Sequence, residues 1–374
     1  MTQDAIDTAR PRHSVPVLED LPDPSGKAVL VRATFDRPLA ADPALPLALV
    51  RARGLASTVE WLTERGARVT VCGDAAASGP AEEVDRLDQI RRAVVSLLSS
   101  AATGEPVAFR SCPEQLDTVE RLVDDYDLFV NDTLQDSSLP LPSVTAPPAR
   151  RPAAAGRTLE QDLRILSPLL VAPARPFVAV LGGARSSDRL HGLRGLVLRA
   201  DTVLLGGALA LPLLQAVGKQ PPDGTSDEFL WECRTAVGLS KRVRHQIVLP
   251  LDLVWKRRDG STVTTPADVR GGEQVVDIGP VTRVRFAEFL RGAAVTLWAG
   301  AVGRVEDDPS AQGSRELARA LRAGSPVVLG GDALVGALQA AGLVPSEADM
   351  LSATDAAIEL LKAGDLPGLA ALRH

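Results

Sequence analysis

One short pattern occurs three times in the second half of the chain: an apolar run, a Gly-Gly pair and a helix-like segment. The copies are PFVAVLGGARSSDR at 176–189, DTVLLGGALALPLLQAVG at 201–218 and PVVLGGDALVGALQAAG at 326–342. Each copy predicts a strand, a glycine turn and the start of a helix. Three copies favour one parallel sheet whose strands all end in glycine.

Parallel sheets bind ligands beyond such strand ends. A helix start opened by glycines also offers backbone N–H groups to an anion, so the repeated pattern indicates phosphate binding. The alternative is that the glycines only let helices pack closely on strands. Because the pattern recurs three times in one half of the chain, we favour phosphate binding.

Composition narrows the class of protein. A chain of 374 residues predicts two domains. The net charge is −6 and no long basic run is present, which argues against a nucleic-acid partner or a membrane-surface patch. The first residues lack the apolar core of a signal peptide, and no apolar stretch is long enough to span a membrane. We therefore expect a cytoplasmic protein that binds small molecules.

The cysteines predict no metal or disulfide chemistry. Cys72, Cys112 and Cys233 are the only cysteines, and none belongs to a C-x-x-C pair. This pattern indicates neither a zinc site nor a disulfide framework. Cys72 lies at the end of a predicted strand, where we expect a buried and inert thiol.

Predicted strands and helices alternate along the whole chain. The predicted strands are 27–39, 67–73, 105–109, 127–132, 177–181, 203–205, 246–255, 275–279, 295–300 and 327–331. The predicted helices include 55–66, 82–98, 113–125, 158–170 and 226–237. This alternation predicts an α/β fold with doubly wound, Rossmann-like parallel sheets.

The domain boundary is predicted from proline content. Residues 138–152 are too rich in proline for a regular element, so we place the seam between the domains there. We expect an N-terminal domain over 1–157, an interdomain helix over 158–172 and a C-terminal domain over 173–364.

The order of motifs along nearly the whole chain resembles the phosphoglycerate kinase family. The motifs are, in order, VLVRATFDRPL, VRARGLASTVEWLTERGARV, DLFVND, RPFVAVLGGARSSDR, DTVLLGGALA, LPLDLV, DIGP, LWAGAVGRVE, LGGDAL and GDLPGLAAL. The resemblance implies two doubly wound domains that face a hinge-closing cleft. It also implies phosphoryl transfer between 1,3-bisphosphoglycerate and Mg-ADP, with the acid on the N-terminal domain and the nucleotide on the C-terminal domain. Residues 365–374 would return to the N-terminal domain, and a monomer is expected.

The resemblance places Mg²⁺ with ADP or ATP on the second domain. It assigns nucleotide binding to Gly182, Gly183, Arg189, Gly206, Gly207, Gly279, Glu306, Gly330, Gly331 and Asp332. Glu306 would bind the ribose, and Asp332 would hold the metal through the nucleotide. Arg185 would be catalytic, although the family has lysine at this position and at Arg189. Arginine keeps the positive charge but is planar and bulkier.

Two further departures lie near the expected phosphates. Ala333 replaces the usual serine or threonine after Asp332. The family's Ser-Thr followed by three glycines has become LSATD at 351–355, where Asp355 adds a negative charge. Both changes remove groups that would favour an anion.

The acid side departs further from the family. Thr34, Phe35 and Asp36 stand at the family's Asp-Phe-Asn, while Arg51 keeps the catalytic arginine and Arg110 matches a later substrate-binding arginine. The family's His-Leu-Gly-Arg has become DAAA at 74–77, and Leu139 replaces a second arginine. Each lost contact to phosphate is worth about 1.5–3 kcal/mol, so acid binding is expected to weaken by several decades.

Three interpretations remain open. The chain is a phosphoglycerate kinase whose activity is weak or lost, a nucleotide-binding pseudoenzyme or regulatory protein on the same scaffold, or a kinase with a different carboxylate acceptor. The first two predict that nucleotide binds and that the phosphorylated acid binds weakly or not at all.

Overall fold

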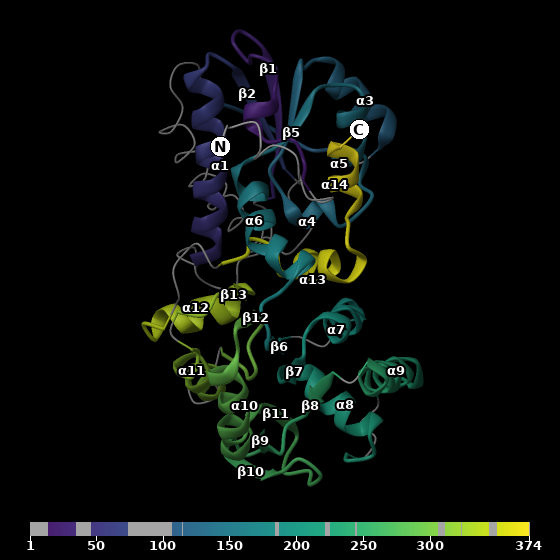
Figure 1. Ribbon diagram of the computed structural model, residues 1–374, viewed down its shortest axis with the longest axis vertical. Helices are drawn as coiled ribbons and strands as arrows, with labels where there is room; N and C mark the ends of the chain where they lie inside the picture. The colour runs from purple at the N-terminus through teal and green to yellow at the C-terminus, as the bar shows by residue number, and fades with distance from the viewer. Residues whose placement is uncertain are drawn as a thin grey trace, which may run out of the picture. The chain divides into compact units, whose positions relative to one another are not determined.

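The chain divides into two compact units, each built around its own sheet (Figure 1). The computed structural model describes residues 14–34, 46–73, 107–113, 115–183, 187–220, 225–243, 245–305, 311–322, 324–343 and 350–373. Several sequence predictions lie outside the described residues, namely Phe35, Asp36, Arg185, Glu306, the loop at 74–77 and the helix at 82–98. Unit 1 comprises Met1–Ala44, Ala48–Ser167 and Gly364–His374, and unit 2 comprises Leu45–Leu47 and Pro168–Ala363.

Unit 1 contains a five-stranded parallel sheet in the order β3-β2-β1-β4-β5. Its strands are β1 Ala28–Arg32, β2 Arg68–Gly73, β3 Ala108–Ser111, β4 Leu128–Asn131 and β5 Ala153–Ala155. The strand order reverses between β1 and β4, where Arg32 and Asn131 are register partners. In doubly wound sheets this switch point is where ligands bind.

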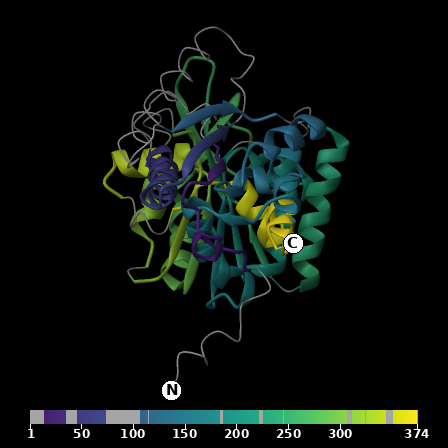
Figure 2. The ribbon, with the colours of Figure 1, turned by 90° about the horizontal axis from the view of Figure 1, so that it is seen from above.

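Both faces of this sheet are covered, as the buried strands β1 and β4 require. Val29 and Val31 pack against α1, Pro46–Glu64, on one face. Leu30 points to the opposite face and packs with residues of α3, Leu116–Asp124. Figure 2, seen from above, shows α1 in indigo and α3 in blue on opposite sides of the strands.

Short helices follow β4, including the segment that we expected to be irregular. They are α4 Leu134–Ser137, α5 Pro142–Thr145 and the 3-10 turn η3 Pro147–Ala149. Residues 138–152 therefore contain one-turn helices, because proline fits the first position of a helix, where no N–H donor is needed. The long helix α6 runs over Arg157–Val171, and the division between the units falls inside it.

The C-terminal helix belongs to unit 1. The helix α14, Pro367–Leu372, packs against α4 and α5. Gly368 allows this approach, since a Cβ at Gly368 would lie 2.7 Å from Ser137 Cα. The motif GDLPGLAAL thus contributes to packing in unit 1.

Unit 2 contains a second five-stranded parallel sheet, in the order β13-β12-β6-β7-β8. Its strands are β6 Phe177–Leu181, β7 Thr202–Leu205, β8 Gln246–Val248, β12 Val295–Ala299 and β13 Val327–Gly330. Numbered along the chain within the unit, this is the same order as in unit 1, and its switch point lies between β6 and β12. The expected α/β fold with two doubly wound sheets is confirmed.

The helices of unit 2 flank this sheet. They are α7 Ser187–Arg199, α8 Ala210–Ala216, α9 Asp227–Val243, α10 Pro280–Gly292, α11 Gln312–Arg319, α12 Asp332–Ala340 and α13 Thr354–Ala363, with the 3-10 turn η4 Gly207–Leu209. Figure 1 places α7 and α9 on one side of the strands and α10 and α11 on the other. None of the described helices is long and apolar enough to cross a membrane.

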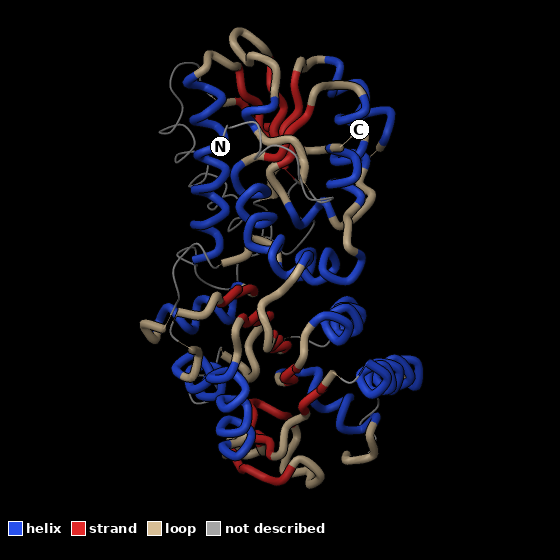
Figure 3. The backbone as a smooth tube through the Cα atoms, in the orientation of Figure 1, coloured by secondary structure: helices blue, strands red, loops and turns tan. Residues whose placement is uncertain are grey.

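One part of the strand prediction for the second half was wrong. Residues 246–255 form two strands, of which only β8 belongs to the parallel sheet. The strands β9 Asp252–Lys256, β10 Thr262–Pro266 and β11 Gln274–Ile278 form a separate antiparallel sheet, whose strands are drawn in red in Figure 3. Pro250 lies in the break between β8 and β9, because proline cannot donate to a strand ladder.

Candidate functional site

The carboxyl end of β6 is held against that of β12 by backbone hydrogen bonds. Gly182 N–H donates to the Ala299 carbonyl over 2.9 Å, and Gly183 N–H donates to the Ala301 carbonyl over 2.7 Å. A Cβ at Gly182 would collide with the Ala301 carbonyl. The two glycines therefore let two strand ends approach closely at the switch point.

The second Gly-Gly pair has the same role. Gly206 N–H donates to Leu181 O over 3.0 Å, and Gly207 N–H donates to Val302 O over 2.7 Å. Gly207 has a φ of +58°, and a Cβ there would lie 2.6 Å from Gly183 N. Strand ends from elsewhere in the unit therefore accept the hydrogen bonds of these four glycine amides, and the assignment of the four glycines to nucleotide binding stays a prediction.

The third Gly-Gly pair stands directly before a helix that has no side-chain cap. Gly331 is the N-cap residue of α12, has a φ of +101° and has no side chain to cap the helix. The first N–H groups of α12 therefore have no intrahelical acceptor. Because α12 begins at the end of β13, its N-terminus lies where the sequence pattern predicts an anion site, and this site stays a prediction.

A second helix begins beside this one. Thr354, the first residue of α13, lies against Gly330, where a Cβ would be 2.8 Å from Thr354 Cγ2. Asp355 is in the first turn of α13, where a carboxylate stabilises the helix dipole. The same charge repels phosphate, and α12 also begins with an acidic residue, Asp332.

The side chains of several predicted nucleotide residues lie outside the described set. Arg189 and Asp332 are placed only as helix backbone, in α7 and α12. Within the described residues, no three His, Cys, Asp or Glu side chains gather to hold a metal.

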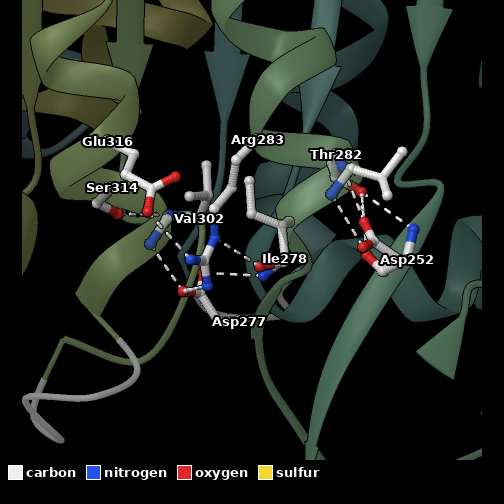
Figure 4. A network of polar contacts seen from close by, with 10 residues as sticks. Asp252, Asp277, Ile278, Thr282, Arg283, Val302, Ser314 and Glu316 are labelled. Atoms are coloured by element: carbon white, nitrogen blue, oxygen red, sulfur yellow. Dashed lines mark hydrogen bonds and ion pairs between the residues drawn. The ribbon is translucent and has the colours of Figure 1, made fainter. Parts of the chain in front are cut away.

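Gly279 lies beside a buried helix cap, which Asp252 and Thr282 form (Figure 4). The Asp252 carboxylate accepts from Thr282 N over 2.8 Å, from Thr282 Oγ1 over 2.6 Å and from Val281 N over 3.0 Å. These bonds satisfy the first N–H groups of α10. A Cβ at Gly279 would collide with this carboxylate, so packing against Asp252 is sufficient to require glycine here.

A second buried carboxylate joins three elements in the same network. Asp277 of β11 accepts from Gly313 N over 2.7 Å and pairs with Arg283 of α10 over 3.0 Å. Arg283 also donates to Ile278 O over 3.1 Å and to Glu316 of α11 over 3.3 Å. Burial raises the pKa of Asp277 to about 6 in spite of these partners.

The switch point of unit 1 contains a buried ion pair. Arg32 ends β1, is fully buried, and places its NH2 atom 2.9 Å from Asp136 Oδ2. Thr34 Oγ1 donates to the same carboxylate oxygen over 2.5 Å and lies 2.6 Å from Thr133 Oγ1. The predicted substrate residue Thr34 is therefore bonded to a carboxylate of the protein itself.

Asp136 is held in place by the start of α4. Its N–H donates to Thr133 Oγ1 over 3.3 Å, which caps the helix. Ser137 Oγ donates to Thr133 O over 2.6 Å and accepts from Asn131 Nδ2 over 2.9 Å. Asp136 is not among the residues predicted from the sequence, although it is the one charged residue in 133–139, which is an available signal.

The two predicted arginines of the acid side lie on separate elements. Arg51 is half-buried in α1, the helix between β1 and β2. Arg110 is exposed on the edge strand β3, where it is the register partner of Cys72. Leu139 is 52% exposed, so an apolar side chain stands in solvent where the resemblance predicts an arginine.

Asp132 caps the long helix α6 from the end of β4. Its carboxylate accepts from Thr158 N over 2.8 Å and from Thr158 Oγ1 over 2.9 Å. Burial raises the pKa of Asp132 to about 7, against an ordinary value of 3.8. Protonated Asp132 therefore stabilises the folded chain below pH 3.8, and this stability is lost as the pH rises through 7.

Asp132→Asn is expected to remove the loss of folding stability that Asp132 causes as the pH rises through 7. The amide keeps one accepting oxygen for Thr158 N and carries no charge, so the variant should be the more stable protein at pH 8. Urea denaturation between pH 4 and pH 8 measures the effect. The pKa of Asp277 is also raised, to about 6, so Asp277 also makes the protein less stable as the pH rises. The dependence of stability on pH that remains in the variant below about pH 6 is therefore assigned to Asp277. If the free energy of unfolding changed equally with pH in wild type and variant above pH 6, the raised pKa of Asp132 would be contradicted.

Comparison with known proteins identifies the relatives of this chain. Residues 101–363 match the family model "Phosphoglycerate kinase". The chain is 32% identical to the phosphoglycerate kinase of Rubrobacter xylanophilus, over 93% of this chain and 95% of that protein. It is 33% identical to that of Parafrankia sp., over 98% and 91% respectively. The fold is similar to the crystal structure of phosphoglycerate kinase from Pyrococcus horikoshii, with a TM-score of 0.74, 22% identity and coverage of 96% and 98%.

Proposed function

Because this chain belongs to the phosphoglycerate kinase family, we propose that it binds Mg-ADP or Mg-ATP through unit 2 and has lost most of the affinity of unit 1 for a phosphorylated acid. Phosphoryl transfer between 1,3-bisphosphoglycerate and Mg-ADP is then weak or absent. The observation that carries this proposal is the buried ion pair of Arg32 and Asp136, to which Thr34 also donates.

Unit 1 supports the loss of acid binding in two ways. The hydroxyl of Thr34 is engaged by Asp136, so an incoming carboxylate or phosphate would bring a second negative charge to that position. Leu139 exposes an apolar side chain where the family uses an arginine. The first contact occupies a hydroxyl that the acid would otherwise use, and the second change removes a charge-assisted hydrogen bond.

Unit 2 supports retention of the nucleotide. The N-terminus of α12 follows Gly331 and offers N–H groups to a phosphate. Arg185 and Arg189 would add positive charge beside the transferring phosphoryl group, and Asp332 would hold the metal-nucleotide. The Mg²⁺ would neutralise phosphate charge when it is bound, which is the main catalytic need of phosphoryl transfer. Asp355 would weaken this site without removing it.

Thermal denaturation with each ligand separately tests the proposal. A ligand of the native state raises the melting temperature, and a concentration of about 100 Kd stabilises by about 2.7 kcal/mol. Mg-ADP should therefore raise the melting temperature by about 5 °C or more. 3-Phosphoglycerate should shift it by less than about 1 °C. A family member with both arginines, measured in the same buffer, should respond to both ligands.

A coupled assay with Mg-ATP and 3-phosphoglycerate measures the remaining activity. Loss of two phosphate contacts should lower kcat/KM by about two to four decades relative to that family member. A shift with the acid but not with the nucleotide, or an ordinary kcat/KM, would overturn the proposal. Nucleotide binding without any transfer would identify a pseudoenzyme, whereas transfer to another carboxylic acid would identify a changed acceptor.

A further inference from the structure

Two cysteines meet at the carboxyl edge of the sheet in unit 1. Cys72 lies at the end of β2 and Cys112 follows β3 directly. The Cys112 thiol donates to Cys72 Sγ over 3.0 Å. Both side chains are buried, at 0% and 7% exposure, in one apolar cluster with Leu30 and Phe129. Neither residue has a part in the proposed nucleotide or acid site.

The backbone on both sides of the pair is fixed by the sheet. Cys112 N–H donates to Gly73 O over 2.6 Å, and Ala33 N–H donates to Cys72 O over 3.0 Å. The sulfurs are therefore brought together by strand ends and not by a chance approach of loops. A disulfide has an S–S bond of about 2.05 Å, so closing the gap needs about 1 Å of movement.

We propose that Cys72 and Cys112 form a reversible disulfide, which makes this pair a redox modification site. The bond would join the ends of β2 and β3 and enclose residues 73–111, which include the predicted substrate residue Arg110. Formation of the disulfide would thus restrain the segment between two strands of unit 1. This revises the expectation that Cys72 is an inert thiol.

The reaction balances with a peroxide as the oxidant. The Cys112 thiolate, the more exposed of the two, attacks one oxygen of hydrogen peroxide, so that an S–O bond forms and the O–O bond breaks, releasing water after proton uptake. The Cys72 thiolate then attacks the sulfenic sulfur, the S–S bond forms, and the hydroxide leaves as a second water. Two thiols lose two electrons and hydrogen peroxide gains them. Because the thiolate is the reactive form, the rate should rise with pH.

Cys233 provides an internal control. It is buried on α9 of unit 2, so its oxidation cannot produce the proposed bond. Cys233→Ser should therefore oxidise in the same way as the wild type. Cys72→Ser and Cys112→Ser should each yield no intramolecular disulfide.

The experiment treats the folded full chain with hydrogen peroxide, blocks remaining thiols and maps peptides by mass spectrometry. We expect a linked peptide containing Cys72 and Cys112, one thiol left out of three, and reversal by a dithiol reductant. Closing a loop of this length should raise the melting temperature of the oxidised chain by about 5 °C or more.

The proposal does not depend on the serine variants, since the linked peptide and the melting temperature are both measured on wild type. It is overturned if the folded wild type yields no linked peptide, or if the link forms only after unfolding in urea. It is also overturned if oxidation proceeds to single sulfinic or sulfonic acids while the other thiol stays reduced.

Discussion

Replacing Asp136 with alanine is expected to lower the free energy of unfolding of unit 1 by about 3–5 kcal/mol. The variant removes the carboxylate that pairs with the fully buried Arg32 and accepts from Thr34. A buried guanidinium that loses its counter-charge keeps its desolvation cost. Urea denaturation, with hydrogen exchange of the backbone amides in the strands of unit 1 as the readout, measures the loss of unfolding free energy.

Two controls separate the ion pair from other effects of the substitution. Asp125→Ala removes an exposed carboxylate at the end of α3 and should change stability by less than about 0.5 kcal/mol. The double variant Arg32→Met with Asp136→Leu replaces both charges by apolar side chains, so it should be less destabilised than Asp136→Ala. A double variant as unstable as the sum of the single variants would contradict this account.

The same residue links stability to function. Asp136→Asn removes the charge but keeps the shape of the side chain, so it suits a binding measurement. If Asp136 excludes the acid, this variant should show a larger thermal shift with 3-phosphoglycerate than the wild type does. An unchanged response would mean that the two missing arginines, at Leu139 and in the loop at 74–77, account for the loss of acid binding without Asp136.

Replacing Arg283 with methionine should destabilise unit 2 by a similar amount, about 3–5 kcal/mol. Arg283 is buried and compensates Asp277, which would otherwise be a buried charge with backbone donors only. Without the arginine, the pKa of Asp277 should rise further above 6, so the variant should lose stability more steeply as the pH rises from 5 to 8. Chemical denaturation over that range is the measurement.

Arg285 on the same helix is the matched control. It is exposed, so Arg285→Met changes the same residue type without removing a buried partner. It should leave the free energy of unfolding within about 0.5 kcal/mol of wild type. If the two methionine variants behaved alike, the network of Figure 4 would contribute little to the stability of unit 2.

The buried carboxylates of unit 1 and unit 2 differ in their position relative to the switch point of each sheet. In unit 2, Asp252 caps α10 and Asp277 joins β11 to α11, and the N-terminus of α12 is the anion site that we propose. In unit 1, Asp136 places a carboxylate at the switch point itself. This difference supports a chain that retains a nucleotide and excludes an acid.

Local sequence was sufficient for the elements of the fold. The run at 176–189 predicts a strand, a turn and a helix, and β6 and α7 lie there, because apolar runs and glycine punctuation act over a few residues. The order of motifs along the chain was sufficient to predict the family. Boundaries near proline were less well predicted, since Pro142 and Pro147 begin short helical turns in a stretch expected to be irregular.

The role of each polar or glycine residue depended on partners distant in the chain. Gly183 resembles a phosphate-binding glycine in sequence, but its N–H is bonded to Ala301, and that acceptor is set by the pairing of β6 with β12. Thr34 and Asp136 are 102 residues apart, and Cys72 and Cys112 are 40 apart. The sequence by itself therefore determined the strand and helix pattern, the family and the missing arginines, because these depend on residue type and local order. Only the tertiary structure decided which groups are already satisfied by the protein and which can still bind a ligand, because strand pairing chooses their partners.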